Sequence, residues 1–443
     1  MKKIFICSLF LLSFCLSSLA QGKFVLQRST RDKINFKLIH NLIVIPVEIN
    51  GVVLSFLLDT GVSKPIIFNF LNLTEELQIN QTERIFLRGL GEGKSVEALK
   101  SKNNIFRIGK AISFSQDLYA IFDPALNFAP KLGVPIHGII GYDLFKDFIV
   151  EVNYSQKFMR LYDPESYKER KCKKCKSFGL NFFNNKPYID VDLMINNIDI
   201  PVKLLIDTGG SDALWLFEDD SKHISIPKKY FVDFLGRGLS GNVYGKRTII
   251  DEISFSDFKL KKVNAAFPDS TSIAFARKFK ERNGSMGGEI LKRFNIIFDY
   301  PNNRISLKKN HHFNNPFYYN KSGIVLEHNG VRVVKEIDRS IEITTFNNEN
   351  ESVTRIPMVV SGSYKYVLAP AFTIVELRKD SPAKIAGLQL GDVILSINNK
   401  QAHAYSLQEI IQLFYGDDGD RIKLLIDRKG VQMRFQFQLK SLL

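Results

Sequence analysis

Ser-Phe-Leu-Leu-Asp-Thr-Gly at residues 55–61 recurs as Lys-Leu-Leu-Ile-Asp-Thr-Gly at residues 203–209. In each stretch an apolar run ends at the same tripeptide, and the two aspartates, Asp59 and Asp207, lie 148 residues apart. A given tripeptide occurs at about one position in several thousand at average composition. Two copies after matching apolar runs therefore indicate a duplicated unit.

Two further pairs of segments repeat at nearly the same distance. Residues 139–146 (Ile-Ile-Gly-Tyr-Asp-Leu-Phe-Lys) match residues 285–292 (Ser-Met-Gly-Gly-Glu-Ile-Leu-Lys), and residues 88–91 (Arg-Gly-Leu-Gly) match residues 237–240 (Arg-Gly-Leu-Ser). Three marks in one order at one spacing predict an internal repeat of about 145 residues.

Each unit has the pattern of paired β-strands. Leu42–Glu48 and Val52–Leu58 are rich in Val, Ile and Leu, and Asn-Gly at residues 50–51 is a strong hairpin turn between them. Ile189–Ile195 and Ile200–Ile206 repeat this arrangement. We therefore expect a mostly β fold with two duplicated barrel-like lobes.

Composition excludes several classes of protein. The chain has 443 residues, of which 45% are hydrophobic and 24% charged, so it is neither wholly disordered, nor collagen, nor a coiled coil. Its net charge is +15, and the clearest basic cluster is residues 165–176. This cluster is typical of a solvated linker, with attraction to an anionic surface as the alternative. No basic array rich in aromatics indicates nucleic acid, and membrane contact is not required.

The first residues have the pattern of an export signal. Lys2 and Lys3 precede the apolar run Ile4–Leu19, and Ser18-Leu19-Ala20 gives small residues before a cleavage point. We expect residues 1–20 to be a signal peptide and the protein to be periplasmic, held in the cell envelope or secreted. An uncleaved anchor is the alternative.

The cysteines fit an exported protein. Cys7 and Cys15 lie in the expected signal, which leaves Cys172 and Cys175. A disulfide between them is favoured because export leads to an oxidising environment. A lone Cys-x-x-Cys without a second pair is a weak zinc signal, so we expect neither a metal nor a cofactor.

Paired Asp-Thr-Gly turns can support acid–base chemistry. If the two units face each other, Asp59 and Asp207 meet, and two adjacent carboxyls share one proton. The ionised carboxylate can take a proton from water while its neutral partner donates to a carbonyl oxygen. The residues that follow each aspartate would support the two loops. Thr60 and Thr208 would brace them through hydroxyl groups, and Gly61 and Gly209 would allow the backbone to approach closely.

Residues 40–310 resemble a single-chain, two-lobe aspartyl protease of the retropepsin-like group. The resemblance rests on both Asp-Thr-Gly motifs and on the apolar-Gly marks at Gly141 and Gly287. In that group a hairpin flap closes over the substrate, which makes two glycine-rich tips the flap candidates: Gly89, Leu90 and Gly91, and Gly238, Leu239 and Ser240.

The chain departs from the pepsin pattern beside each aspartate. Val62 follows Gly61, and Gly210 follows Gly209, where pepsin-like enzymes usually carry a hydroxyl that hydrogen-bonds the carboxylate. Losing a hydrogen bond to the charged form raises a carboxyl pKa. We therefore predict activity at milder acidity than that of pepsin.

The C-terminal part resembles a PDZ domain of the kind found on bacterial proteases. The motif at residues 381–394 (Ser-Pro-Ala, then Gly-Leu, then Gly-Asp-Val-Ile) carries the resemblance, which covers roughly residues 370–440. A PDZ domain implies a peptide or C-terminal ligand added to a sheet edge. The candidate binding residues are Gly323, Ile324 and Val325, with an insertion at about residues 327–368.

These observations predict an exported aspartic endopeptidase whose PDZ domain recruits or positions a protein substrate. The expected parts are a signal at 1–20, lobes at 21–164 and 165–310, and a PDZ domain at 320–443. The alternative is a non-enzymatic envelope protein that binds peptides through a protease-like shell and a PDZ domain. We expect a monomer, because the duplication supplies both aspartates, although a homodimer as in viral enzymes is a third hypothesis.

Overall fold

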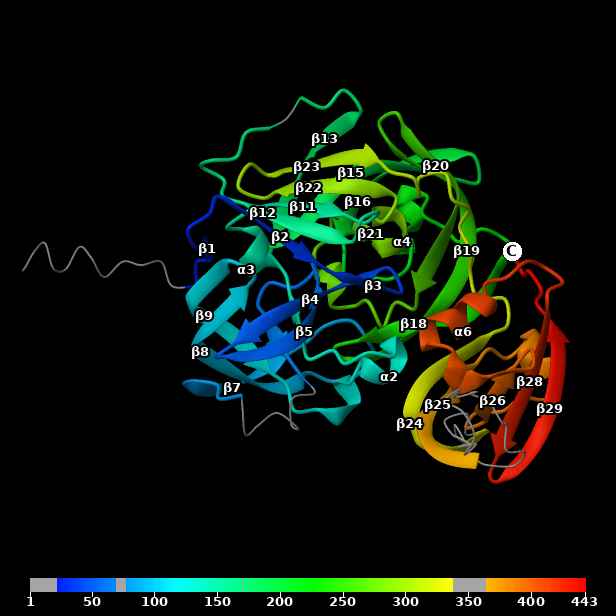
Figure 1. Ribbon diagram of the computed structural model, residues 1–443. Helices are drawn as coiled ribbons and strands as arrows, with labels where there is room; N and C mark the ends of the chain where they lie inside the picture. The colour runs from blue at the N-terminus through cyan, green and yellow to red at the C-terminus, as the bar shows by residue number, and fades with distance from the viewer. Residues whose placement is uncertain (1–21, 69–76, 170, 338–363) are drawn as a thin grey trace, which may run out of the picture. The chain divides into compact units, whose positions relative to one another are not determined.

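The computed structural model describes residues 22–68, 77–169, 171–337 and 364–443. The expected signal peptide lies outside these residues, and so does much of the expected insertion. The chain forms two compact units, Met1–Tyr319 with Ser441–Leu443, and Asn320–Lys440. Each unit is described by itself below (Figure 1).

The first lobe is built on a nine-stranded sheet in the order β1-β9-β6-β10-β5-β4-β8-β7, with β3 beside β4. The strand β10 runs parallel to β5, with Ile140 opposite Leu58. The strands are β1 (Val25–Leu26), β3 (Lys37–Ile39), β4 (Leu42–Ile49), β5 (Val52–Leu58), β6 (Ile66–Ile67), β7 (Thr82–Leu87), β8 (Val96–Ile108), β9 (Ala111–Ala120) and β10 (Gly138–Ile140).

The second lobe repeats this plan in an eight-stranded sheet, in the order β14-β15-β16-β21-β17-β20-β19-β18. Here β21 runs parallel to β16, with Met286 opposite Ile206, as β10 does to β5. The strands are β14 (Asn181–Phe183), β15 (Lys186–Ile195), β16 (Ile198–Ile206), β17 (Leu214–Leu216), β18 (Tyr230–Gly238), β19 (Gly241–Phe255), β20 (Phe258–Pro268) and β21 (Arg282–Met286).

A six-stranded sheet joins the two lobes, in the order β13-β23-β22-β11-β12-β2. Its centre is the antiparallel pair β11 and β22, one strand from each repeat, where Val150 lies opposite Phe298 and both side chains are fully buried. The two lobes therefore share one hydrophobic core. The strands are β2 (Arg31–Asn35), β11 (Ile149–Asn153), β12 (Phe158–Tyr162), β13 (Cys175–Gly179), β22 (Phe294–Asp299) and β23 (Arg304–Lys309).

Helices of this unit are short. The equivalent helices α3 and α4 follow β10 and β21, and they begin just after Gly141 and Gly287. The helical segments are η2 (Pro124–Leu126), α2 (Ala129–Leu132), α3 (Tyr142–Phe145), η3 (Asp220–Lys222), η4 (Ala276–Lys278) and α4 (Gly288–Leu291). In the linker between the lobes, Cys172 and Cys175 form a disulfide.

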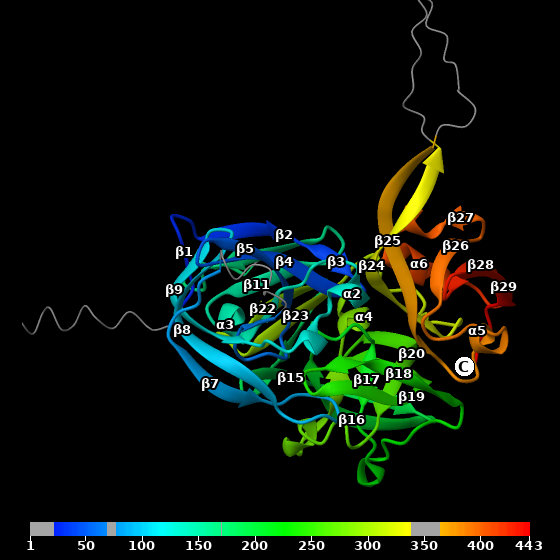
Figure 2. The same cartoon turned by 90° about the horizontal axis from the view of Figure 1, so that it is seen from below.

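The second unit is a six-stranded sheet in the order β24-β25-β26-β28-β29, with β27 beside β26 (Figure 2). Its edge strand β24 pairs with β25 and contacts the helix α6. The elements are β24 (Ile324–Ile337), β25 (Tyr364–Leu377), α5 (Pro382–Ile385), β26 (Val393–Ile397), β27 (Lys400–Gln401), η5 (Ala402–Ala404), α6 (Leu407–Leu413), β28 (Arg421–Arg428) and β29 (Val431–Gln438).

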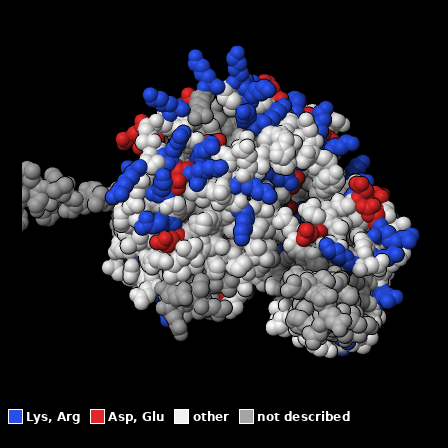
Figure 3. Space-filling model, in the orientation of Figure 1, with Lys and Arg blue, Asp and Glu red and all other residues white. Residues whose placement is uncertain are grey.

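Figure 3 shows the charged side chains on one face of the molecule. On this face, Lys and Arg side chains gather over the upper half of the protease-like unit, with a few acidic side chains among them. Among the described helices, none is long and apolar enough to cross a membrane.

Candidate active site

Asp59 and Asp207 occupy equivalent positions at the ends of β5 and β16. The amide of Asp59 donates to the carbonyl of Ile140 at 2.8 Å, and the amide of Asp207 donates to the carbonyl of Met286 at 2.9 Å. Each aspartate is therefore held by the strand that runs parallel to its own. This is the role of the repeated apolar-Gly marks in the sequence.

Glycine is required at those marks because the backbone of the aspartate loop passes very close. A Cβ atom on Gly141 would overlap the carbonyl oxygen of Asp59, and a Cβ on Gly287 would overlap that of Asp212. Neither overlap can be relieved by a side-chain movement, since both atoms are backbone. The spacing between each Asp-Thr-Gly motif and its downstream glycine thus reflects a direct contact.

The two threonines next to the aspartates interlock across the repeat. Thr60 Oγ1 donates to the carbonyl of Ile206 at 2.6 Å, and Thr208 Oγ1 donates to the carbonyl of Leu58 at 2.7 Å. Each hydroxyl also accepts from the backbone amide of the other threonine at 3.0 Å. Both side chains are buried, so the hydrogen bonds are shielded from water. The loops carrying the aspartates are therefore fixed to each other.

The two carboxyl groups are neighbours: a Cβ on Gly61 would lie 3.0 Å from Asp59 Oδ1 and 3.6 Å from Asp207 Oδ1. Gly61 N donates to Asp59 Oδ1 at 2.7 Å, and Gly209 N donates to Asp207 Oδ1 at 3.1 Å. A Cβ on Gly209 would overlap the Asp59 carboxyl, which explains the glycine of that motif. Burial, and then the charge of Asp207, raise the pKa of Asp59 to about 7. The pair can therefore hold one proton near neutral pH.

The surroundings of the two carboxyls are not equivalent. Burial raises the pKa of Asp207 as well, but the cations of Arg282 and Lys186 oppose this rise, followed by the amides of Gly209 and Gly210. Asp59 receives the Gly61 amide and a weaker contribution from Lys186. More donors and positive charge therefore favour the ionised form of Asp207, and Asp59 is the better place for the proton.

Sequence reasoning did not identify Lys186 or Arg282. Arg282 is 7% exposed and donates from Nη2 to Ser285 Oγ at 2.7 Å and from Nε to the Gly284 carbonyl at 3.1 Å. Its partner Ser285 is the residue that replaces a large apolar side chain in the second apolar-Gly mark. That polar replacement, three residues after an arginine, was the available signal for a buried cation.

The two flap candidates meet at their tips. Residues Gly89–Gly91 lie between β7 and β8, and Leu239–Ser240 lie between β18 and β19. Ser240 N donates to the Leu90 carbonyl at 2.9 Å, Gly89 N donates to Ser240 Oγ at 3.1 Å, and Gly93 N donates to the Ser240 carbonyl at 2.6 Å. The tips are thus joined by hydrogen bonds from one repeat to the other.

Each tip also presents a leucine to apolar residues of the opposite lobe. Leu90, from the first lobe, packs against two clusters of the second lobe. Leu239, from the second lobe, packs against a cluster of the first lobe. The residues beside Leu90 are Phe217, Ile273 and Ala276 in one cluster, and Leu235, Val243, Ala266 and Trp215 in the other.

A second contact fastens the first flap to the opposite lobe. Gly91 N donates to the Ser272 carbonyl at 2.9 Å, and Thr271 Oγ1 donates to Glu92 Oε1 at 2.9 Å. Beside the tips lies a cavity of about 730 Å³, whose lining includes Leu239 and Ser240 but neither aspartate. Within the described parts of the chain, no group of three or more His, Cys, Asp or Glu side chains could hold a metal.

In the second unit, the candidate peptide-binding residues lie at the start of the edge strand. Gly323 directly precedes β24, and Ile324 and Val325 are its first two residues. Ile324 is opposite Leu377 and Val325 is opposite Glu376, at the end of β25. The described ends of the expected insertion, residues 327–337 and 364–368, belong to β24 and β25 themselves. Gly323 has φ +78°, and a Cβ there would meet the Ser381 side chain.

Comparison with protein-family models matches residues 45–144 and 191–288 to the aspartyl protease family, and residues 373–428 to the PDZ domain. A comparison with curated proteins found no match. The chain therefore combines two aspartyl protease lobes of the retropepsin-like type with a C-terminal PDZ domain, and it is mostly β. These parts of the sequence-based prediction are confirmed.

Proposed function

We propose that the protein is an aspartic endopeptidase that hydrolyses peptide bonds with a water molecule activated by Asp59 and Asp207. The observation that carries this proposal is the pair of neighbouring carboxyls, one from each repeat, on loops that the threonines lock together. Such a pair needs only a bound water and a peptide carbonyl to complete the reacting group.

In the proposed reaction, Asp207 is the base and Asp59 is the acid. The Asp207 carboxylate takes a proton from water, the water oxygen bonds to the carbonyl carbon, and Asp59 gives its proton to the carbonyl oxygen. The tetrahedral intermediate then returns that proton to Asp59 as the carbonyl re-forms. The carbon–nitrogen bond breaks as the amine nitrogen receives the proton held by Asp207. No covalent intermediate is formed.

The flaps support an endopeptidase that encloses its substrate. The joined tips would have to part to admit a peptide and could close again over it, donating backbone hydrogen bonds. Their glycines suit such a movement because glycine tolerates a wide range of backbone angles. The PDZ domain would recruit or position the protein to be cleaved.

Export is part of the proposal. The N-terminal sequence pattern and the disulfide between Cys172 and Cys175 both favour an oxidising location outside the cytoplasm. Fractionation of producing cells, followed by N-terminal sequencing of the protein, tests both the location and the expected cleavage after Ala20. Recovery of full-length chain in the cytoplasm would contradict it.

Cleavage of a random peptide library by the full chain, across pH and with and without pepstatin, tests the activity. We expect cleavage that pepstatin blocks and that both Asp59→Asn and Asp207→Asn abolish. Absence of cleavage by the wild-type chain at every pH would instead favour the non-enzymatic peptide-binding protein.

A further inference from the structure

We propose that the PDZ domain captures an extended internal segment of a protein along β24 and does not read a free C-terminal carboxylate. This inference rests on the proposed peptide-binding role of the domain and specifies its ligand. PDZ domains add a peptide as a new strand at a sheet edge, and a terminal carboxylate is bound by a nest of backbone amides. Both features can be examined at the start of β24.

The amide nest at this strand is already filled from within the chain. The backbone amides of Ser322 and Gly323 both donate to Asn320 Oδ1 at 3.0 Å, and the Ser322 hydroxyl donates to the same oxygen at 2.8 Å. The next amide, that of Ile324, donates to Ser322 Oγ at 3.0 Å. Three successive amides therefore have acceptors without any ligand.

Asn320 Oδ1 occupies the place of a terminal carboxylate oxygen, and the Asn320 side-chain nitrogen occupies the place of a ligand's last backbone amide. Asn320 Nδ2 donates to the carbonyl of Ile324 at 2.6 Å, which is the bond that the last amide of an added strand would make. Ser322 is fully buried, so a carboxylate cannot approach from its side. A free C-terminus would have to displace Asn320 and break these bonds before forming its own.

The same end of the strand is tied to α6. Lys321 N donates to the Phe414 carbonyl at 3.0 Å, and Lys321 Nζ donates to the Gly416 carbonyl at 2.6 Å. These bonds join the nest to the residues just after α6. A ligand must therefore bind further along β24, where a chain that continues past the site has the advantage over one that ends there.

The rest of β24 is suited to a long partner. It spans residues 324–337 as the edge of the sheet, and beyond the bulge near His328 it pairs with β25 alone among the described strands. One face of this ribbon carries exposed apolar side chains at alternate positions, between 51% and 71% exposed: Val331, Val333, Ile337, Tyr364, Tyr366 and Leu368. A strand added at the edge would extend this face, so the expected ligand has apolar residues at alternate positions.

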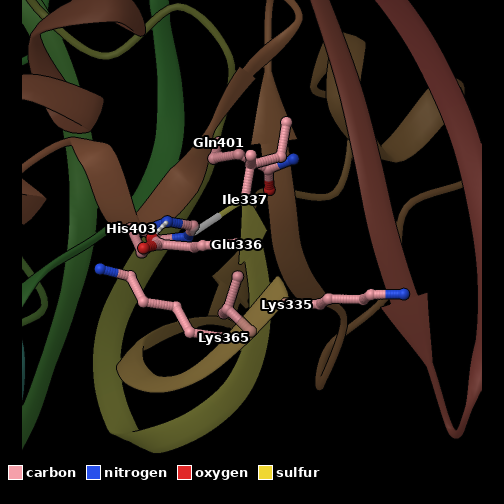
Figure 4. A pocket seen from close by; sticks show the side chains of 7 residues that line it. Lys335, Glu336, Ile337, Lys365, Gln401 and His403 are labelled. Carbon is pink, nitrogen blue, oxygen red and sulfur yellow. Dashed lines mark hydrogen bonds and ion pairs between the residues drawn. The ribbon is translucent and has the colours of Figure 1, made fainter. Parts of the chain in front are cut away.

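A pocket of about 630 Å³ lies at the far end of the same strand (Figure 4). Glu336 of β24 and His403 face each other there, with Oε1 and Nε2 3.2 Å apart, while Lys335 points away from them. The edge of β24 thus runs from Ile324, beside the filled nest, to Ile337, beside this pocket. A ligand that reaches this pocket is longer than a terminal tail of a few residues.

Proline at Val333 provides a variant that blocks strand addition with little damage to the fold. Val333 is two residues from Val331, which lies opposite Pro370, a residue with no N–H to donate. In an antiparallel pair the backbone groups of such alternate residues point away from the partner strand. Val333→Pro therefore removes an amide that faces the open edge, where proline is tolerated. Val333→Thr keeps the amide and is the matched control.

The test uses the full chain carrying Asp59→Asn, so that bound peptides are not cleaved. Two libraries share one random stretch with alternating apolar residues. One ends in a free carboxylate, and the other places the stretch between Gly-Ser flanks and ends in an amide. We expect matched members of the two libraries to bind within about twofold of each other. Val333→Pro should weaken binding at least about tenfold, and Val333→Thr should not.

Removing the Asn320 side chain from the nest should create a preference for a free C-terminal carboxylate. Asn320→Ala should make the free-acid library bind about tenfold more tightly than the amidated one. If the chain with Asn320 intact bound peptides of the free-acid library but not the matched amidated peptides, the inference would be overturned. So would a dimer that Val333→Pro dissociates in sedimentation, because the strand edge would then serve a second copy. Failure of peptide cleavage leaves this test intact, since it measures binding alone.

Discussion

Thr60 and Thr208 exchange the same hydrogen bonds in both directions, each backbone amide donating to the other hydroxyl at 3.0 Å. Their hydroxyls also donate to the carbonyls that end the opposite aspartate-bearing strands. Two residues 148 positions apart in the sequence are thereby joined by reciprocal hydrogen bonds. The approximate twofold relation of the repeats is thus present at atomic detail beneath the two carboxyls.

Thr60→Val should destabilise the protein and reduce its activity. The change leaves the Thr208 amide and the Ile206 carbonyl buried without partners, and each such group costs about 1–3 kcal/mol. We expect the melting temperature to fall by several degrees. Thr60→Ser keeps the hydroxyl and should retain most of both properties. Equal melting temperatures for the wild type and Thr60→Val would show that the interlock does not matter.

Asp59→Asn and Asp207→Asn should each reduce peptide cleavage by at least about 10²–10⁴-fold, because one general acid or base is lost. Neither change alters side-chain volume appreciably, so the fold should persist, as circular dichroism would show. Conversion of a surface carboxyl outside the site, Asp190→Asn, is the control and should leave cleavage unchanged. Substantial cleavage by either active-site variant would remove that aspartate from the mechanism.

The rate should be highest in mildly acidic to neutral solution. The pKa of Asp59 is raised to about 7, so the singly protonated pair persists below that pH and loses its proton above it. Cleavage should therefore fall by about tenfold per pH unit above about pH 7, and fall again in acid as Asp207 becomes protonated. Measuring kcat/KM from pH 2 to 9 checks this, and a maximum below about pH 3 would contradict it.

The raised pKa of Asp59 should also make the stability of the folded protein depend on pH. The folded value of about 7 lies above the usual 3.8, so the folded state binds this proton more tightly than the unfolded state. The resulting stabilisation is complete below about pH 4 and is lost as pH rises through 7. The melting temperature of Asp59→Asn should therefore gain on that of the wild type between pH 4 and 7.5. If the melting temperatures of the wild type and Asp59→Asn changed equally with pH, Asp59 would not be the group that holds the proton.

Gly91→Ala should reduce the proposed peptide cleavage more than it reduces the stability of the fold. Gly91 has φ +116°, and an added Cβ would lie 2.6 Å from the amide nitrogen of Gly241, so the flap tips could not meet. Gly51→Ala is the matched control, because Gly51 has φ +94° with nothing within 4 Å of the new atom. Both variants should lose about 1–2 kcal/mol of stability from the positive φ. Only Gly91→Ala should lose activity. Equal activities of the two variants would show that the contact between the flap tips is not needed for cleavage.

The repeat made much of the candidate site's geometry predictable. Matching spacing identified the two aspartates, their threonines and the downstream glycines, because each of these residues is constrained by a backbone contact that both lobes need. The flap candidates followed from the same alignment of the repeats. Their mutual hydrogen bonds did not, since tip-to-tip contact depends on how the two lobes face each other. Asn320 was also missed, because nothing in its neighbourhood distinguishes an asparagine that fills a nest from one in an ordinary turn.

The amino-acid sequence alone determined that two equivalent loops each carry an aspartate, since a strand end, a small residue and a hydroxyl are local requirements. Only the tertiary structure decided how the two carboxyls differ. Arg282 reaches Asp207 from β21, far from it in the chain, and Lys186 reaches it from the start of the neighbouring strand β15. Desolvation and Coulomb energy depend on distance in space and on burial, and neither quantity can be obtained from separation along the sequence.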